Sequence, residues 1–282
     1  MQHSTKSALI TGASSGIGRA TALYLHQHGW TVFAGVRRKR DGQALRAETS
    51  AQLHPILLDV TNSAQIDTAA ATINEILGNG RGLDALINNA GISITEPLEC
   101  VTIETLRTQL EVNTIGPIAL TQACLPLLRQ AKGRIINISS GMGRMSMPFA
   151  GPYSASKYAL ETLSDTLRME LRDDQIEVIL IEPGSIATEI WRKGTQMRQD
   201  TMNSWSEQDR QRYGRRFTNF AKMNDDVTKL LPQHVVNVIV KALTAKRPRP
   251  RYLVGNDVRI ALLLNWLPTR WRDALLLWIM NR

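Results

Sequence analysis

The stretch Thr11-Gly12-Ala13-Ser14-Ser15-Gly16-Ile17-Gly18 stands between an apolar run at residues 7–11 and an amphipathic run at residues 17–28. The first run predicts a buried strand and the second predicts a helix. Glycines at such a turn let the backbone approach a pyrophosphate, which binds the free N–H groups of the helix N-terminus. The spacing is G-x-x-x-G-x-G, not the commoner G-x-G-x-x-G. The prediction of a dinucleotide site therefore rests on the position of the glycines between a strand and a helix. The residues expected to contact the dinucleotide are Gly12, Ser14, Ser15, Gly16, Ile17 and Gly18.

Alternation of apolar and amphipathic runs continues beyond this turn. Further strands are predicted at residues 31–36, 55–58, 83–87, 134–138 and 177–181, and helices at 64–77, 103–128, 153–171 and 232–243. The strands are nearly continuous apolar runs, as expected where helices cover both faces of a parallel sheet through right-handed crossovers. The predicted fold class is therefore α/β, with a doubly wound parallel sheet flanked by helices.

Length and composition indicate an ordinary globular chain. It has 282 residues, of which 43% are hydrophobic and 21% charged, which excludes disorder, collagen and coiled coil as whole-chain descriptions. Two cysteines, Cys100 and Cys124, cannot build a disulfide framework, and no secretory leader is evident, so we expect a cytoplasmic location. The longest apolar runs, residues 261–264 and 274–280, are far shorter than the ~20 residues of a spanning helix.

A basic run follows the second predicted strand. The chain reads Gly35-Val36-Arg37-Arg38-Lys39-Arg40, with no carboxylate before Asp41. An acidic residue here would bind a ribose 2′-hydroxyl, whereas an arginine fork binds a 2′-phosphate. NADP(H) is therefore favoured over NAD(H), with Arg37 as main phosphate ligand and Arg38 as its helper. The alternative is an ordinary exposed basic loop.

A tyrosine and a lysine stand one helical turn apart in Tyr153-Ser154-Ala155-Ser156-Lys157. Residues four apart lie on one helix face, so their polar ends can approach each other. A free tyrosine has a pKa near ~10, and a nearby ammonium stabilises the phenolate. This arrangement suits Tyr153 to general acid–base work, although the spacing alone is common and unspecific.

Together, these motifs resemble the classical short-chain dehydrogenase/reductase family. The further matching segments, in the family's order and approximate spacing, are Asp59, Asn88-Asn89-Ala90-Gly91, Asn113, Ile138-Ser139-Ser140 and Pro183-Gly184-x-x-x-Thr188. The resemblance covers roughly residues 5–190. It implies a Rossmann-type subunit with a seven-stranded parallel sheet that uses a nicotinamide cofactor without metal. The five histidines are scattered and suggest no metal site.

The resemblance also implies residue roles. Tyr153 would exchange a proton with the carbonyl or alcohol, and Lys157 would hold the nicotinamide ribose and lower the tyrosine pKa. Ser140 would hydrogen-bond the reacting oxygen, with Ser139 as the alternative if the register slips by one. Asn113 would hold a water that relays protons through Lys157; its plain alternative is a helix-surface asparagine. The remaining cofactor contacts implied by the resemblance are Asp59 and Val60, Asn89, Ala90 and Gly91, and Pro183, Gly184, Ile186 and Thr188, with Asn88 supporting the sheet and cofactor.

The substrate side has weaker signals. Residues 188–231 are polar but carry aromatics, which a solvated linker would not need, so they predict a lid over the strand ends. Met142, Met145 and Met147 would suit either a lipophilic pocket or ordinary core packing. The segments at residues 32–37 and 251–255 look similar to the branch with retinol and hydroxysteroid dehydrogenases. The lid aromatics are Trp191, Trp205, Tyr213, Phe217 and Phe220.

The C-terminal segment is basic and apolar. Eight basic residues stand against Asp257 and Asp273 between positions 246 and 282. We divide the chain into residues 1–255, a dehydrogenase domain with its lid at 188–231, and a helical extension at 256–282. The extension could cover the pocket, form a seam of a homo-oligomer (dimer or tetramer), or make peripheral membrane contact. Without a recognition motif, the basic charge does not indicate nucleic-acid binding.

The sequence thus predicts an NADP(H)-dependent oxidoreductase that interconverts a hydrophobic secondary or allylic alcohol, steroid-, retinoid- or lipid-like, and its carbonyl. One alternative is a 3-oxoacyl-thioester reductase of fatty-acid type, whose basic surface would dock an acidic carrier protein. The other is a non-catalytic module that senses the dinucleotide.

Overall fold

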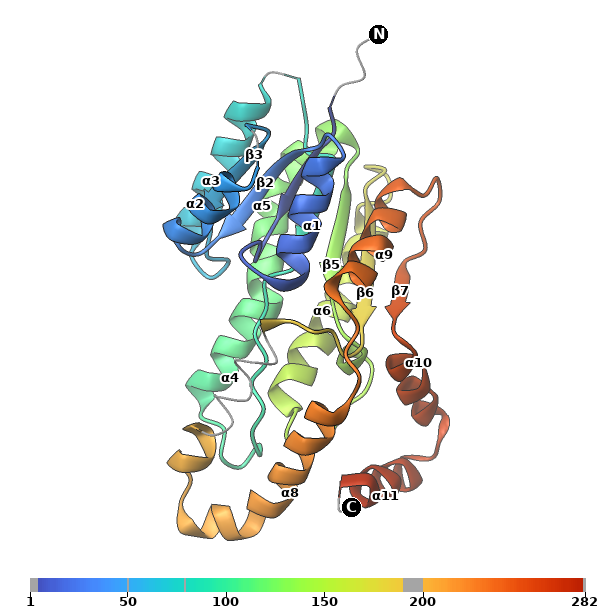
Figure 1. Ribbon diagram of the computed structural model, residues 1–282. Coiled ribbons are helices and arrows are strands. Elements are labelled where there is room, and N and C mark those ends of the chain that lie inside the picture. Colours follow the sequence, from blue (N-terminus) through green and yellow to red (C-terminus); the bar gives the residue numbers. More distant parts are fainter. Residues whose placement is uncertain (1–4, 50, 79, 190–199, 281–282) are drawn as a thin grey trace.

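The computed structural model describes residues 5–49, 51–78, 80–189 and 200–280, and it is built around a parallel sheet (Figure 1). In the described residues the sheet has seven strands in the order β3-β2-β1-β4-β5-β6-β7, which confirms the predicted Rossmann-type fold. The strands are β1 (Ser7–Ile10), β2 (Thr31–Val36), β3 (Leu53–Leu57), β4 (Ala85–Asn88), β5 (Arg134–Ile138), β6 (Glu177–Pro183) and β7 (Arg251–Val254).

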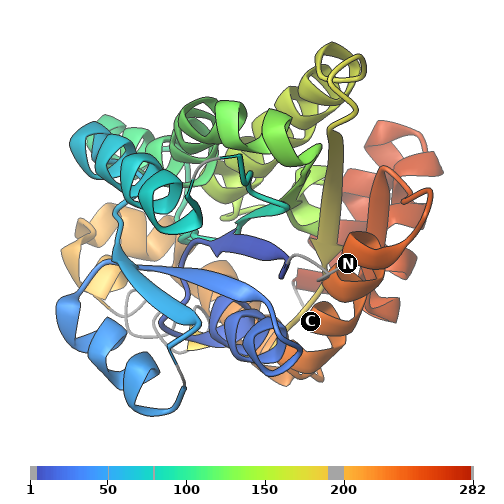
Figure 2. The ribbon, with the colours of Figure 1, turned by 90° about the horizontal axis from the view of Figure 1, so that it is seen from above.

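Helices cover both faces of this sheet, and Figure 2 shows the three layers from above. α1 and α9 pack side by side on one face, and α3 and α5 pack together on the other. The helices of this layered body are α1 (Gly16–Gln27), α2 (Lys39–Ala47), α3 (Ser63–Leu77), α4 (Ile103–Leu110), α5 (Gly116–Ala131), α6 (Gly151–Glu170) and α9 (Pro232–Thr244).

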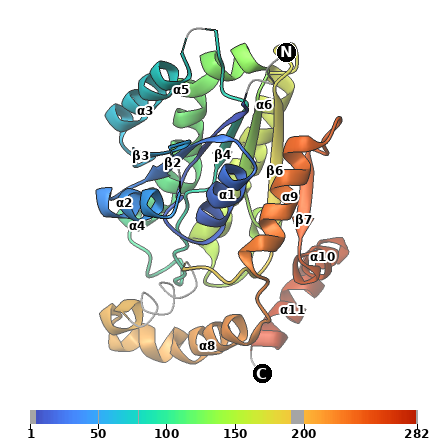
Figure 3. The same ribbon diagram turned by 45° about the horizontal axis from the view of Figure 1, so that its top comes forward.

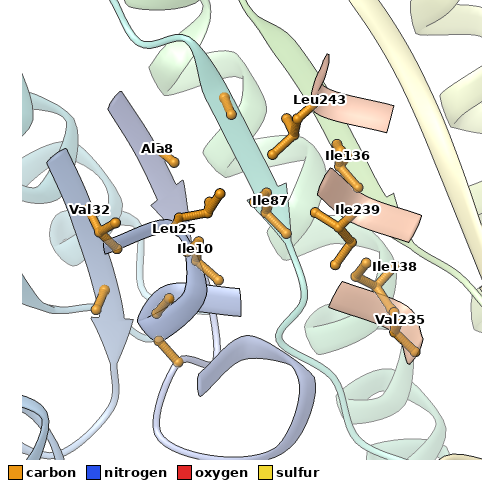
Figure 4. Close-up of a cluster of buried hydrophobic side chains, with 14 of the residues drawn as sticks. Ala8, Ile10, Leu25, Val32, Ile87, Ile136, Ile138, Val235, Ile239 and Leu243 are labelled. Atoms are coloured by element: carbon orange, nitrogen blue, oxygen red, sulfur yellow. The ribbon is translucent and has the colours of Figure 1, made fainter. Parts of the chain in front are cut away.

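Strand pleating divides the core between the two faces. Successive strand residues point to opposite sides of a sheet, so Ala8 and Ile10 enter one hydrophobic cluster and Leu9 enters the other. Figure 4 shows the first cluster, where Ile10 and Ile87 face Ile239 of α9. Both clusters are fully apolar, which explains why the strand sequences show no polar alternation.

The periodicity of the sequence did not predict α2, β7 or the helix α8 (Glu207–Asp226) inside the predicted lid. α2 begins at Lys39, inside the basic run for which an exposed loop was the alternative, and buries only Gly42 and Leu45, so its helical periodicity is weak. β7 is a four-residue edge strand that begins with Arg251. The predicted helix at residues 103–128 is also more complex, because a π-helical turn, η1 (Glu111–Ile115), separates α4 from α5.

The described part of the predicted lid is held by aromatic packing. α8 (Glu207–Asp226) lies beyond the ends of the strands, at the foot of the molecule in Figure 1. Phe217 is fully buried, with ring centroids 5.3 Å from Phe149 and 5.1 Å from Trp205. Residues 190–199, including Trp191, lie outside the described residues. This part of the predicted lid is thus a helix that packs on Phe149 and Met280 through a small aromatic cluster.

The C-terminal extension forms α10 (Asn256–Leu263), a 3-10 turn, η3 (Leu264–Trp266), and α11 (Thr269–Met280). Val258 and Leu262 of α10 pack against Met145, and the buried Met280 of α11 joins the aromatic cluster under α8. Figure 3 shows the end of α11 beside α8. No helix among the described residues has the length and apolar character needed to span a bilayer.

Candidate active site

A cavity of about 350 Å³ opens where the strands end, and the residues that follow β4, β5 and β6 line it. This edge includes the switch point between β1 and β4, where ligands bind in open α/β sheets. Ser140, Tyr153 and Lys157 supply polar groups, while most of the wall is apolar. The cavity therefore joins polar chemistry to a hydrophobic lining, as ligand sites commonly do.

The glycine-rich turn has the close contacts that exclude side chains. Gly16 has φ +55°, and a Cβ there would lie 3.2 Å from Cγ2 of Thr188. A Cβ on Gly18 would lie 2.4 Å from the backbone oxygen of Gly12, a distance that real atoms do not show. The turn thus leaves a bare backbone cradle at the start of α1. It fits the phosphates of a dinucleotide, and it brings the predicted contacts Gly16 and Thr188 together.

Asn89 braces this cradle from the neighbouring strand. Its Nδ2 donates to the carbonyl oxygen of Thr11 at 2.8 Å, and the Thr11 hydroxyl accepts from the amides of Asn89 and Ala90. Asn88 lies deeper, where its Nδ2 donates to Oδ1 of Asn137 on β5 at 2.8 Å. The Asn-Asn-Ala-Gly segment, predicted as cofactor contacts with Asn88 as support, therefore ties β4 to the glycine turn and to β5.

Tyr153 and Ser140 meet at the cavity wall. A hydrogen bond between their hydroxyl groups lowers the pKa of Tyr153, but burial acts more strongly and the net direction is upward. Ser139, the alternative serine, lies instead against Glu161 of α6. Ser140 is thus the serine beside Tyr153, and the lowered tyrosine pKa implied by the family resemblance does not occur in the protein alone.

Lys157 is buried one turn along α6 from Tyr153. Its Nζ lies 5.9 Å from the Tyr153 ring centroid and donates to the carbonyl oxygen of Ile138 at 2.8 Å. Burial lowers the pKa of Lys157 to about 8, and the negative charge of Glu161 opposes this shift. Among the described residues, no carboxylate forms an ion pair with Lys157. The hydrogen bond to the Ile138 carbonyl oxygen therefore stabilises its ammonium group.

Near this lysine, two buried glutamates, Glu161 and Glu182, form ion pairs with partly exposed arginines in a network that sequence reasoning missed. Nε of Arg251 is 3.1 Å from Oε2 of Glu161 and 3.3 Å from Oε1 of Glu182, and Arg144 is 3.4 Å from the second oxygen of Glu182. Burial raises the pKa of both glutamates. In the sequence, Glu182, a charged residue inside a mostly apolar strand, is the one hint of this network.

Asn113 occupies the π-helical turn and is fully buried, so it is not a surface asparagine. Its Oδ1 accepts from the amide of Ile92, and its Nδ2 donates to the Ile92 carbonyl at 2.9 Å and to Oγ of Ser156 at 3.0 Å. Both amide hydrogens are therefore engaged by the protein. Asn113 joins η1, the segment after β4 and α6.

The basic residues after β2 are free to bind an anion. Arg37 and Arg38 are exposed, and neither forms an ion pair within the described ranges. Asp59, expected at the adenine, uses its Oδ1 to accept from the amide of Thr61 at 3.0 Å and from its hydroxyl. Val60 is buried, and its backbone oxygen would lie 2.6 Å from a Cβ on Gly116.

The predicted contacts after β6 are held by a residue that sequence reasoning did not single out. Oδ2 of Asp257, in the first turn of α10, accepts from the amide of Ser185 at 2.7 Å. Ile186 pairs with Leu230 as an isolated bridge, and the amide of Gly184 donates to the carbonyl oxygen of Val254 in β7. Contacts with β7, α10 and residue 230 therefore set the backbone conformation of Pro183, Gly184 and Ile186. Thr188 lines the cavity with these residues.

Comparison with known proteins identifies the family. The pattern described as short chain dehydrogenase matches residues 6–199, which is more than half of the chain. The protein therefore belongs to the short-chain dehydrogenase/reductase family and is an oxidoreductase. Within the described residues no group of three or more His, Cys, Asp or Glu side chains could hold a metal ion.

Relatives share nearly the whole chain. An NADPH-dependent 3-dehydrocapnine reductase from Ornithobacterium rhinotracheale is 39% identical, with 88% of this chain and 87% of the relative aligned. Retinol dehydrogenase 16 from Homo sapiens is 36% identical over 97% of this chain and 88% of its own, which confirms the expected likeness to the retinol branch. A Burkholderia cenocepacia short chain dehydrogenase solved with NADP is 26% identical, covers 98% and 99% of the two chains, and has a TM-score of 0.75.

Proposed function

We propose that this protein uses NADP(H) to interconvert a hydrophobic secondary or allylic alcohol and its carbonyl, with Tyr153 as the acid–base residue. The observation that carries the proposal is the meeting of the Tyr153 and Ser140 hydroxyl groups at the wall of a mostly apolar cavity, with buried Lys157 one helical turn away. Family membership supports the reaction class, and the cavity lining supports the hydrophobic substrate.

The residues around the switch point suit NADP(H). The bare backbone at Gly16 and Gly18 would accept the pyrophosphate, while Arg37 and Arg38 would bind the 2′-phosphate with charge-assisted hydrogen bonds. Asp59 and Val60 would border the adenine, and Thr188 the carboxamide. The preference agrees with the NADPH in the name of one relative and the NADP in a solved one. When bound, the cofactor supplies or accepts the hydride.

Proton transfer belongs to the protein. In carbonyl reduction, Tyr153 would donate its phenolic proton to the substrate oxygen while the Ser140 hydroxyl donates a hydrogen bond to the same oxygen. Protonated Lys157 would stabilise the resulting phenolate and hold the nicotinamide ribose. Because both amide hydrogens of Asn113 are engaged, a water that replaces the proton through Lys157 would bind the Asn113 backbone carbonyl, not its side chain.

The substrate would be large and apolar around its polar end. Met142, Met145 and Met147 line the cavity, with Phe220 and Met223 of α8 on the lid side. Flexible thioethers fit irregular apolar shapes, which suits a steroid-, retinoid- or lipid-like molecule. Met145 also packs in the core with Val258, so core packing and a lipophilic lining are compatible at this position.

The test is an NADPH oxidation assay with lipophilic ketones and aldehydes, with 3-oxoacyl thioesters as the competing substrate class. The Tyr153→Phe variant should lose about 10²–10⁴-fold in kcat while NADPH affinity, measured by calorimetry, changes little. Preferred turnover of thioesters would favour the fatty-acid alternative. Binding of NADPH without turnover of any carbonyl, in both wild type and variant, would favour the sensor. A cytoplasmic location and a homo-oligomeric state stay predictions.

A further inference from the structure

The C-terminal helices expose large apolar side chains that the fold does not use. Ile260 and Leu263 of α10 are 65% and 64% exposed, and Trp266 and Trp271 are 88% and 70% exposed. Soluble proteins rarely leave tryptophans this open, because each ring carries a large apolar area. We name these four residues the C-terminal apolar surface. In Figure 1 their two helices form the outer edge of the molecule beyond β7.

Arginines are interleaved with this surface. Arg259 precedes Ile260, and Arg270 precedes Trp271; both are exposed, and in the described part of the chain neither has a carboxylate within ion-pair distance. The two acidic residues of these helices are already engaged, since Asp257 holds the Ser185 amide and Asp273 lies 3.4 Å from Arg272. The surface therefore combines tryptophan, leucine and isoleucine with two arginines that form no ion pair among the described residues.

We propose that the C-terminal apolar surface docks on an anionic lipid membrane. Short helices that carry tryptophan and leucine among arginines lie in the headgroup region, where rings enter the acyl boundary and guanidinium groups meet lipid phosphates. Neither helix spans the bilayer, so contact is peripheral. Two copies of this chain packed through the same surface would bury Arg259 and Arg270 while Asp257 and Asp273 of the same helices are already engaged, and burying an unpaired charge is costly.

Docking would place the membrane beside the cavity. α10 has two sides: Val258 and Ala261 line the cavity, while Ile260 and Leu263 point to solvent. One helix thus separates the cavity from the docking surface. An apolar molecule leaving the bilayer would have a short path to the cavity. The docking itself requires no catalytic activity, and its test is independent of the proposed reaction.

The test is co-sedimentation of the full chain with phosphatidylcholine vesicles that contain or lack phosphatidylglycerol. We expect binding to the anionic vesicles and weaker binding at high salt. The double variant Trp266→Ser/Trp271→Ser should bind at least about tenfold more weakly. The variant Arg259→Gln/Arg270→Gln should lose about fivefold per arginine on anionic vesicles only. As a matched control, Met169→Ser removes a 63% exposed apolar side chain from α6 and should change nothing.

Because the substituted side chains are exposed, folding should persist, and unchanged circular dichroism will verify this. Absence of vesicle binding by the folded wild type would overturn the proposal, as would equal loss of binding in the Met169→Ser control. Light scattering tests the alternative that a second copy of this chain covers the surface. A wild-type dimer that does not bind vesicles, and that becomes monomeric in the tryptophan variant, would assign the surface to a second copy.

Discussion

The ammonium group of Lys157 donates a 2.8 Å hydrogen bond to the carbonyl oxygen of Ile138, the last residue of β5. This bond joins α6 to the strand that leads directly into Ser139 and Ser140. Tyr153 lies one helical turn before Lys157, and Ser140 lies two residues after Ile138. The bond therefore fixes the positions of Tyr153 and Ser140 relative to each other. The same burial that enforces this geometry makes the lysine charge sensitive to pH.

Carbonyl reduction should weaken as Lys157 loses its proton. Burial holds the pKa of Lys157 at about 8, below its ordinary 10.5, so the charge is present below pH 8 and lost above it. We expect kcat/KM for NADPH to fall above about pH 8 with the loss of one proton. In Glu161→Gln the descending limb should move to lower pH, because Glu161 raises the lysine pKa. A profile that stays flat to pH 9.5 would rule out an essential charged Lys157.

Cofactor preference should depend on Arg37. Calorimetry with NADPH and NADH should show at least tenfold tighter binding of NADPH, which is about 1.4 kcal/mol, and Arg37→Asp should reverse the order. Arg40→Asp introduces the same charge change at a residue that already lies 3.7 Å from Asp41 and should leave the order intact. Equal effects of the two variants would mean that net charge, not a specific ligand, sets the preference.

Gly18 should not tolerate a side chain. The added methyl of Gly18→Ala would overlap the Gly12 oxygen and Nδ2 of Asn89, so we expect a loss of about 1–3 kcal/mol in the free energy of unfolding. In contrast, Gly214 lies within α8 with no atom within 4 Å of its Cβ position. Gly214→Ala should therefore leave stability unchanged or raise it by up to about 1 kcal/mol. Urea titration of both variants measures the difference.

Ionisation of Glu182 should oppose folding at neutral pH. Burial raises its pKa above the ordinary 4.5, so the folded chain binds more protons than the unfolded chain between these two values, and the contribution to stability falls as pH rises through them. Glu182→Gln lacks this proton exchange. The unfolding free energy of the variant minus that of the wild type should consequently be more positive at pH 7 than at pH 4.5. A difference that does not change with pH would refute the raised pKa of Glu182.

The lid should loosen separately from the sheet. Phe217 is buried in an aromatic cluster distinct from the two clusters that cover the sheet. Phe217→Ala should make residues 200–226 sensitive to limited proteolysis while the main unfolding transition moves little, because lid opening leaves the sheet clusters intact. Leu86→Ala, inside a sheet cluster, should instead lower the main transition, at a cost of about 2–5 kcal/mol. A common shift for both variants would show one cooperative unit.

Much of the fold followed from local patterns. Continuous apolar strands and the glycine turn predicted a doubly wound sheet, and the structure confirms it. α2 and β7 were missed because few of their side chains are buried, so hydrophobic periodicity carries little signal there. The C-terminal boundary at residue 255 stays a prediction, although α10 contributes directly to the cavity wall.

The sequence by itself determined what depends on neighbouring residues: a strand-to-helix turn of glycines, and the four-residue spacing that puts Tyr153 and Lys157 on one face. Tertiary structure alone decided the rest. Arg251 meets Glu161 and Glu182 from positions far along the chain, and Asp257 reaches back to Ser185. Burial decides which charges shift their pKa, and burial is produced by segments distant in sequence. No local sequence pattern encodes this burial, because the desolvation of a charged side chain depends on all the segments that pack around it.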